Sequence, residues 1–185
     1  MSYPLIKYQL NKQLKIKPFF LGGTIIQRPE KSIVFGESSV VDKYYMAIVQ
    51  GIMPNEPFTI ESYIGRDPND RKKMTSQAPL HPKLALTHGV VEKYIDGKYT
   101  LLKLKIITGR THQIRVHMSS IGYPIIGDNV YANDAINTEV LDKYGLTRQA
   151  LHACEIGIEL YGKKHIFKAP LKPDMQKIIE QTESI

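Results

Sequence analysis

The 185-residue chain has a single cysteine, Cys154, which excludes an internal disulfide and a cysteine metal cluster and fits a reducing compartment. Its apolar surroundings favour a small core residue over a nucleophile. No apolar run approaches the roughly 18 residues of a membrane span, so we expect no membrane partner. The sequence also lacks a glycine-rich phosphate loop, an HExxH motif and Cys/His ligand spacing. We therefore expect neither a metal nor a cofactor.

Acidic residues are absent from positions 1–29, which carry Lys7, Lys12, Lys15, Lys17 and Arg28. The whole chain has a net charge of +7 and a pI near 9.3. This balance favours a polyanionic partner, with nucleic acid first, over a merely basic solvated surface. An acid-free basic N-terminus is also typical of organelle transit segments. Arginine and serine are scarce before Gln27, however, so we expect a cytoplasmic protein and keep an organelle as the alternative.

Apolar patterning predicts mostly hairpin-linked strands with a few helices. We expect strands at 44–49, 58–64, 84–94, 99–107, 150–160 and 165–169, and helices at 136–144 and from Pro173 onward. Asp96-Gly97 and Gly162-Lys163 are the expected hairpin turns, and Pro79 to Pro82 a rigid loop. The sum predicts an α+β fold with a mixed, largely antiparallel sheet and a few flanking helices.

The stretch from Ile106 to Tyr131 is the densest in polar groups whose spacing suggests a specific role and not mere solvation. We predict that Thr111 caps a helix ending near Ser120, with Gly122 as its stop. One face of this helix should be apolar, with Ile114, Met118 and Ile121, and another polar, with His112, Arg115 and Ser119.

Arg115 and the preceding Arg110 suit a bound anion, either a carboxylate or a phosphate. The alternative is a structural salt bridge for Arg115, with core positions for the histidines. His112, His117 and His152 invite a metal site, but His112 and His117 lie five residues apart on one helix and do not share a face, which argues against it. We expect Asp128 to cap a turn rather than act as an acid.

A second basic cluster lies at residues 66–73, RDPNDRKK, and offers Arg66, Arg71, Lys72 and Lys73. We expect these side chains to contact phosphates, in a manner that depends on salt and is mostly blind to sequence. The alternative is a solvated loop.

Five segments in order resemble the RluA-type RNA pseudouridine synthases. They are KYYMAIVQG (43–51), IGRDPNDRKKM (64–74), ITGRTHQIRVHMSSIGYPIIGDNVYA (107–132), RQALHA (148–153) and FKAPLKPDM (167–175). The resemblance covers about residues 40–180. It implies a pseudouridine synthase-like catalytic domain that isomerises uridine in rRNA or tRNA, needs no cofactor or metal, and works as a monomer on a flipped-out nucleotide.

The resemblance also implies roles for individual residues. Arg115 corresponds to the arginine paired with the catalytic aspartate, and Tyr45 to the tyrosine that stacks on the base and assists proton removal. Leu151 corresponds to the apolar pocket wall. Arg110, His112, Arg66, Arg71, Lys72 and Lys73 are the further substrate-binding candidates.

One family element is missing. The aspartate belongs to an Arg-Leu-Asp-x-x-Thr-Ser-Gly segment well before the tyrosine, and no such segment is present. Asp42 is the only aspartate before residue 67 and lies too close to Tyr45 in sequence. We therefore predict a divergent or truncated N-terminal segment at 1–38 and an N-terminally incomplete catalytic domain at 39–185. The alternative function is a catalytically inactive RNA-binding remnant that lacks the nucleophile.

Overall fold

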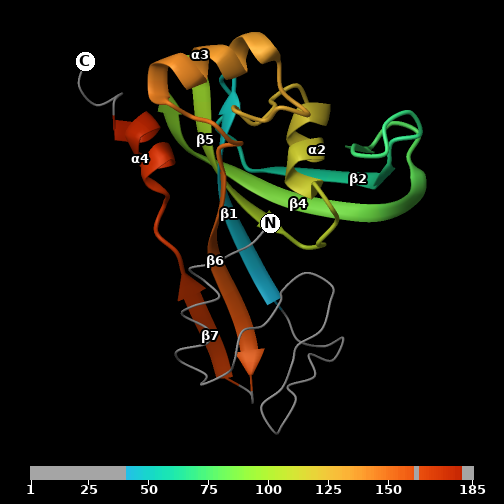
Figure 1. Cartoon of the computed structure of the whole chain (residues 1–185). Coiled ribbons are helices and arrows are strands. Elements are labelled where there is room, and N and C mark those ends of the chain that lie inside the picture. The colour runs from blue at the N-terminus through green and yellow to red at the C-terminus, as the bar shows by residue number, and fades with distance from the viewer. Residues whose placement is uncertain (1–40, 161–162, 181–185) are drawn as a thin grey trace, which may run out of the picture. The chain divides into compact units, whose positions relative to one another are not determined.

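The computed structural model describes residues 41–160 and 163–180 (Figure 1). The predicted segment 1–38 and the Gly162 turn position lie outside these ranges. The elements are β1 (Val41–Gln50), β2 (Phe58–Arg66), β3 (Met74–Thr75), β4 (Leu80–Ile95), β5 (Tyr99–Ile106), α2 (Gln113–Ser120), α3 (Asp134–Tyr144), β6 (Leu151–Leu160), β7 (Lys163–Lys168) and α4 (Pro173–Glu180).

The chain divides into two compact units. The larger comprises residues 44–152 and the C-terminal segment from Leu171, and its strands lie in the order β3-β2-β4-β5-β1. The pairs β2–β3, β2–β4 and β4–β5 are antiparallel. In the smaller unit β6 and β7 form an antiparallel hairpin, with ion pairs from Lys164 to Asp42 and from Lys168 to Glu155. The predicted α+β fold with a largely antiparallel sheet is confirmed.

The β4–β5 hairpin turns at the predicted Asp-Gly dipeptide. Asp96 and Gly97 both have positive φ, 53° and 60°. A tight turn of this kind matches the twist of the flanking strands, and Asp and Gly tolerate it better than other residues. The Asp-Gly dipeptide alone was therefore enough to predict this turn.

The rigid loop predicted at Pro79 to Pro82 is wrong, because β4 already begins at Leu80. The pairing passes from Ile64↔Lys83 to Arg66↔Leu80, so β4 uses one more residue than β2 at this point. Such a bulge accommodates a proline that cannot donate to the ladder. The short strand β3 was not predicted.

The start of helix α2 also differs from its prediction. Its N-cap is His112, in a left-handed conformation with φ 55°, and not Thr111. No side chain among the described residues caps the helix. Instead Gln113 Oε1 accepts hydrogen bonds from Arg110 N (3.0 Å) and Thr108 Oγ1 (2.7 Å) in the turn that precedes it. The first residue of the helix therefore stabilises the turn that leads into it.

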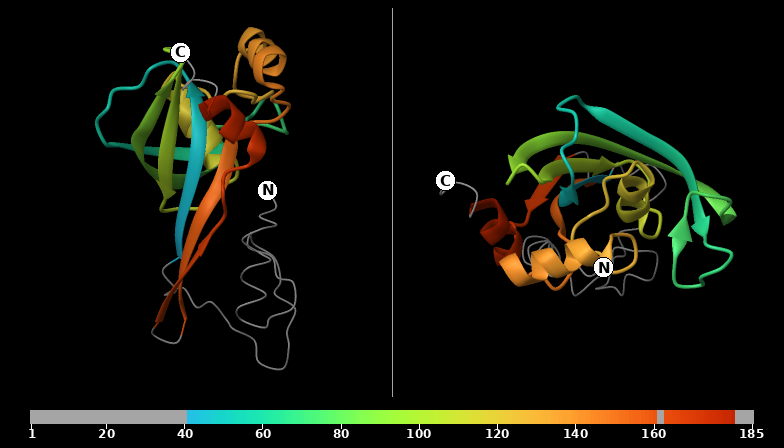
Figure 2. Two further views of the ribbon diagram at one scale, coloured as in Figure 1. Left: turned by 90° about the vertical axis from the view of Figure 1, so that its left-hand side faces the viewer. Right: turned by 90° about the horizontal axis from the view of Figure 1, so that it is seen from above.

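The predicted polar face of α2 is present, because His112, Arg115 and Ser119 all contact Tyr131, but this face is not turned to solvent. Every residue from Gln113 to Met118 is buried, polar ones included. Figure 2 shows why: β2 and β4 curve around the helix, which lies on their inner side. A helix enclosed in this way needs a specific partner for each polar side chain.

The remaining helices follow their sequence signals. Asn133 caps α3 by accepting a hydrogen bond from Ala135 N (2.8 Å), and Gly145 ends the helix with φ 70°. Pro173 begins α4, as predicted. No helix within 41–160 or 163–180 is long and apolar enough to cross a membrane.

Candidate active site

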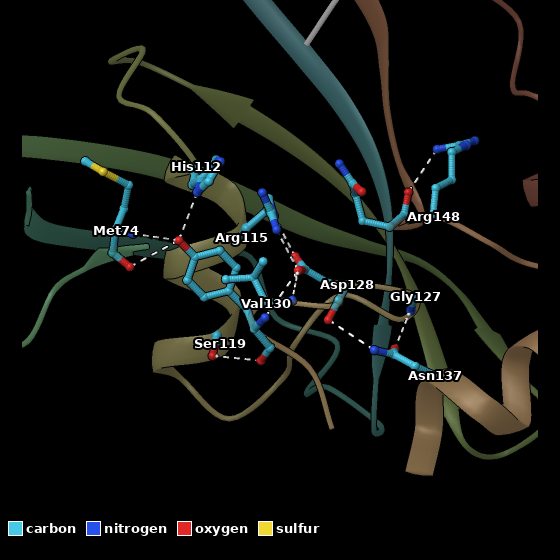
Figure 3. Close-up of polar contacts among 11 residues, drawn as sticks. Met74, His112, Arg115, Ser119, Gly127, Asp128, Val130, Asn137 and Arg148 are labelled. Atoms are coloured by element: carbon cyan, nitrogen blue, oxygen red, sulfur yellow. Dashed lines mark hydrogen bonds and ion pairs between the residues drawn. The ribbon is translucent and has the colours of Figure 1, made fainter. Parts of the chain in front are cut away.

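Arg115 on α2 forms a bidentate ion pair with Asp128 (Figure 3). Its Nε donates to Asp128 Oδ2 at 2.6 Å, and its Nη2 donates to Oδ1 at 2.7 Å. Asp128 is fully buried and Arg115 is 8% exposed. The parallel fork of two charge-assisted bonds fixes the guanidinium in both position and plane.

A tight turn delivers Asp128 to this position. Gly127 precedes it with φ 72°, and a Cβ there would lie 2.3 Å from the carbonyl oxygen of Arg148, so only glycine fits. Asp128 Oδ1 accepts hydrogen bonds from Val130 N (3.0 Å) and Tyr131 N (3.2 Å). The prediction that Asp128 caps a turn is confirmed, and the same carboxylate also holds Arg115.

Asn137 of α3 locks this turn from the other side. Its Oδ1 accepts from Gly127 N at 2.9 Å, and its Nδ2 donates to Asp128 O at 3.1 Å (Figure 3). Sequence reasoning missed Asn137, because an exposed-looking asparagine inside a helix carries no distinguishing pattern.

The Asp128 carboxylate accepts four hydrogen bonds and has no exposed surface. It therefore orients Arg115 and does not face a substrate. Burial lowers the pKa of Arg115, but the hydrogen bonds and charge of Asp128 outweigh this, and the pKa is raised overall. The guanidinium stays charged at every physiological pH.

One amino group of Arg115 remains available. Nη2 and Nε are bound to Asp128, whereas Nη1 makes no hydrogen bond within the described residues and is not fully buried. Because the pair with Asp128 fixes the plane, Nη1 points in a set direction. It is the donor that an incoming carboxylate or phosphate would meet first.

The ring of Tyr131 packs beside this pair. The Arg115 Cζ lies 4.8 Å from the ring centroid, and the His112 ring meets it edge-on with centroids 5.7 Å apart. Burial and the charge of Arg115 lower the pKa of His112. His112 is therefore mainly neutral near pH 7 and adds no charge to the site.

The predicted basic cluster forms a compact loop before β3. Arg66, Arg71 and Lys72 are exposed and Lys73 is half-buried, with its Nζ 5.7 Å from the centroid of the Tyr131 ring. Asp67 and Asp70 stabilise the turn, because their carboxylates accept hydrogen bonds from backbone N–H groups within the loop. The loop thus presents cations on a backbone that holds its own shape.

Arg110 does not join Arg115 in one anion clamp. Its Nε donates to the backbone carbonyl of Leu84 at 2.9 Å, which directs the side chain along β4. His117 is also accounted for, since its ring nitrogens contact Thr87 Oγ1 (2.9 Å) and Ser62 Oγ (3.1 Å). Burial lowers the pKa of His117 to about 4. His117 therefore occupies a core position, which was the alternative prediction for the histidines.

Tyr45 and Leu151 lie at buried positions of β1 and β6, the two strands beside the segment that leads to Asp128. Ile126 N donates to Ile48 O in β1 at 3.1 Å, and Ile126 O accepts from Ala150 N at 2.9 Å. Tyr45 lies three residues before Ile48, and Leu151 follows Ala150. The segment that ends in Asp128 is therefore held between the two strands that carry these predicted site residues.

Comparisons with known proteins identify the family of the chain. The model of the RNA pseudouridylate synthase family matches residues 27–120, about half of the chain. An uncharacterized RNA pseudouridine synthase of Chloroflexus aurantiacus is 41% identical over 145 residues, covering 76% of this chain and 42% of the relative. The ribosomal large subunit pseudouridine synthase D of Neisseria meningitidis is 36% identical over 152 residues, covering 77% and 39%. The chain thus spans less than half the length of these curated relatives.

Solved structures show the same fold. The human RNA pseudouridylate synthase domain containing 1 aligns with a TM-score of 0.61 and 27% identity, covering 78% of this chain and 66% of that one. The human domain containing 4 aligns with a TM-score of 0.60 at 22% identity, a likeness of fold alone. With its motifs, its fold and the family match in agreement, the chain belongs to the RNA pseudouridylate synthase family, as an RluA-type member.

Proposed function

We propose that this protein isomerises uridine to pseudouridine in structured RNA, with rRNA or tRNA as the substrate class. The observation that carries the proposal is the fixed guanidinium of Arg115, which keeps Nη1 available while Asp128 occupies its other two nitrogens. Residues 39–185 form the catalytic domain, acting as a monomer in the cytoplasm without metal or cofactor. The name of the Neisseria relative, which refers to the large ribosomal subunit, supports rRNA.

The reaction breaks the N1–C1′ bond of uridine and forms a C5–C1′ bond, while a proton leaves C5 and N1 gains one. The family resemblance pairs Arg115 with a nucleophilic aspartate that no residue of this sequence has been matched to. In the proposed reaction Arg115 Nη1 orients that carboxylate and keeps it ionised. Tyr45 supplies the ring that stacks on the base, and Leu151 the apolar wall. Asp128 is not the nucleophile, because it is fully buried and its carboxylate already accepts four hydrogen bonds.

RNA docking falls to the exposed cations of the 66–73 loop. Arg66, Arg71 and Lys72 are exposed on a loop whose four cations outnumber its two aspartates, so the net charge of the loop is positive. Such contacts position a phosphate backbone without reading its sequence. They also predict that RNA affinity falls steeply with added salt.

The second candidate is the RNA-binding remnant. It is favoured by one observation, the absence of the Arg-Leu-Asp-x-x-Thr-Ser-Gly segment from the sequence. The remnant would bind RNA through the same loop and leave uridine unchanged.

Incubation of the full chain with uridine-labelled RNA separates the two candidates. We expect pseudouridine from the wild type and at least a hundredfold slower product formation from Arg115→Ala, because electrostatic groups at a reacting centre commonly contribute this much. Lys98→Ala, a surface cation paired with Glu139, is the matched control and should retain activity. Tight RNA binding with no pseudouridine in the wild type would refute the enzyme and establish the remnant.

A further inference from the structure

The hydroxyl of Tyr131 joins the RNA-docking loop to the Arg115 site. Met74 N donates to Tyr131 Oη at 2.9 Å, and Tyr131 Oη donates to Met74 O at 3.1 Å. His112 Nδ1 lies 2.9 Å from the same oxygen. In Figure 3 the dashed lines from Met74 and His112 meet at this atom.

Met74 is an edge position that lacks a strand partner on one side. It pairs with Arg66 of β2, and β3 is the outermost strand of the order β3-β2-β4-β5-β1. In an antiparallel ladder the N–H and C=O of one residue point to the same side. Tyr131 Oη therefore replaces a missing strand, accepting from the amide and donating to the carbonyl.

With the hydroxyl proton directed to Met74 O, His112 takes the donor role in its contact with the same oxygen. A phenol has one proton and two lone pairs. With its proton on Met74 O and one lone pair on Met74 N, its remaining lone pair accepts a hydrogen bond from His112 Nδ1–H. A neutral or a protonated imidazole can both donate through Nδ1, so the contact survives a change of charge on His112.

The ring and the hydroxyl of Tyr131 contact different parts of the site. The ring lies beside Arg115 and Lys73, and it packs with Met74 against the core cluster of Ile64, Ala85 and Val116. The backbone of Tyr131 is held by Asp128 Oδ1 and by Ser119, whose Oγ donates to Tyr131 O at 3.3 Å. One residue therefore contacts both the arginine pair and the strand that ends the basic loop.

We propose that Tyr131 is a positioning residue that sets the basic loop 66–73 relative to Arg115, so that RNA held by the loop presents its uridine at the active site. The loop's own hydrogen bonds fix its shape but not its direction, because β3 has only two register pairs with β2. The Tyr131 hydroxyl supplies the missing anchor. The proposal rests on the proposed function for its consequence in catalysis, and on geometry alone for the anchor.

Tyr131→Phe tests the hydroxyl while keeping the ring. Two hydrogen bonds to Met74 are lost, so we expect amide exchange at Met74 to rise at least tenfold while Lys73 N, bonded to Asp70 O within the loop, is unchanged. RNA Kd and KM should rise about three- to tenfold at unchanged kcat, because Arg115–Asp128 is untouched. Tyr131→Leu also removes the ring beside Arg115 and should lower kcat as well.

Tyr94→Phe is the matched control. Its hydroxyl also donates to a backbone carbonyl, Met53 O at 2.9 Å, outside the Arg115 site. This variant should leave Met74 exchange, KM and kcat as in the wild type.

Each result of the Tyr131→Phe measurements decides one part of the proposal. Unchanged exchange at Met74 overturns the anchor itself. Faster exchange with unchanged RNA affinity overturns its role in positioning the loop. If the wild type makes no pseudouridine, the proposed function fails, but the exchange and RNA-affinity measurements still decide the anchor and the positioning.

Discussion

Two ion pairs in the larger unit have almost the same length and very different surroundings. Arg115–Asp128 spans 2.6 Å and Lys98–Glu139 spans 2.7 Å. The side chains of the first pair are 10% and 0% exposed, and those of the second 59% and 40%. Distance alone would rank them as equals. The difference is that removing one partner of the buried pair leaves the other charge without its counter-ion and with little access to water.

Breaking the buried pair should have the largest effect. Asp128→Asn keeps the side-chain volume and can still accept backbone hydrogen bonds, but it leaves Arg115 charged and unpaired in the interior. We expect the free energy of unfolding to fall by about 3–5 kcal/mol. Urea unfolding followed by circular dichroism measures it. A loss below about 1 kcal/mol would contradict the view that the pair is electrically isolated from solvent.

The buried neutral side chain of His117 also distinguishes the interior from the exposed surface, because protonating it should cost stability. His117 has a folded pKa of about 4, whereas an unfolded histidine titrates near 6.5. Below pH 6.5 the unfolded chain binds a proton that the folded chain does not, so stability falls as pH drops from 6.5 to 4. The loss should reach roughly 3 kcal/mol at pH 4.

Unfolding free energies measured across this pH range check the expectation. His117→Gln removes the titrating group and should flatten the curve in that range, whatever its stability at pH 7. A wild-type curve with the same slope as the variant would mean that His117 is not the source.

Breaking the exposed pair should have the smallest effect. Glu139→Gln removes the carboxylate from Lys98, but water solvates both groups in either case, so we expect no measurable change in Tm. The hydrogen bond from Lys98 lowers the pKa of Glu139. A clear drop in Tm would show that this part of α3 is more enclosed than its exposure indicates.

Local patterns sufficed wherever the cause was local. The Asp96-Gly97 turn, the end of α3 at Gly145 and the start of α4 at Pro173 follow from the backbone preferences of those residues. The strands around Tyr45 and Phe58 follow from apolar runs. The family motifs identified Arg115 because a motif is itself a local pattern.

The failures share the opposite cause. The Pro79–Pro82 loop became part of β4 because β2 lay beside it and a bulge absorbed the extra residue. Helix α2 has His112 and not Thr111 at its N-cap, and its preceding turn is stabilised by the hydrogen bonds of Gln113 Oε1 with Arg110 N and Thr108 Oγ1. β2 is distant from Leu80 in sequence, and the Gln113 side chain carries no recognised capping signal, so the local preference failed in both cases.

The sequence by itself predicted the α+β fold and the basic loop, and it singled out Arg115 as the leading site candidate. Only the tertiary structure decided which carboxylate holds that arginine. Asp128 read as a turn residue, which it is, and nothing local linked it to a side chain thirteen positions away. The link exists because the Gly127 turn carries Asp128 into the buried side of α2, where an arginine must be paired to be kept.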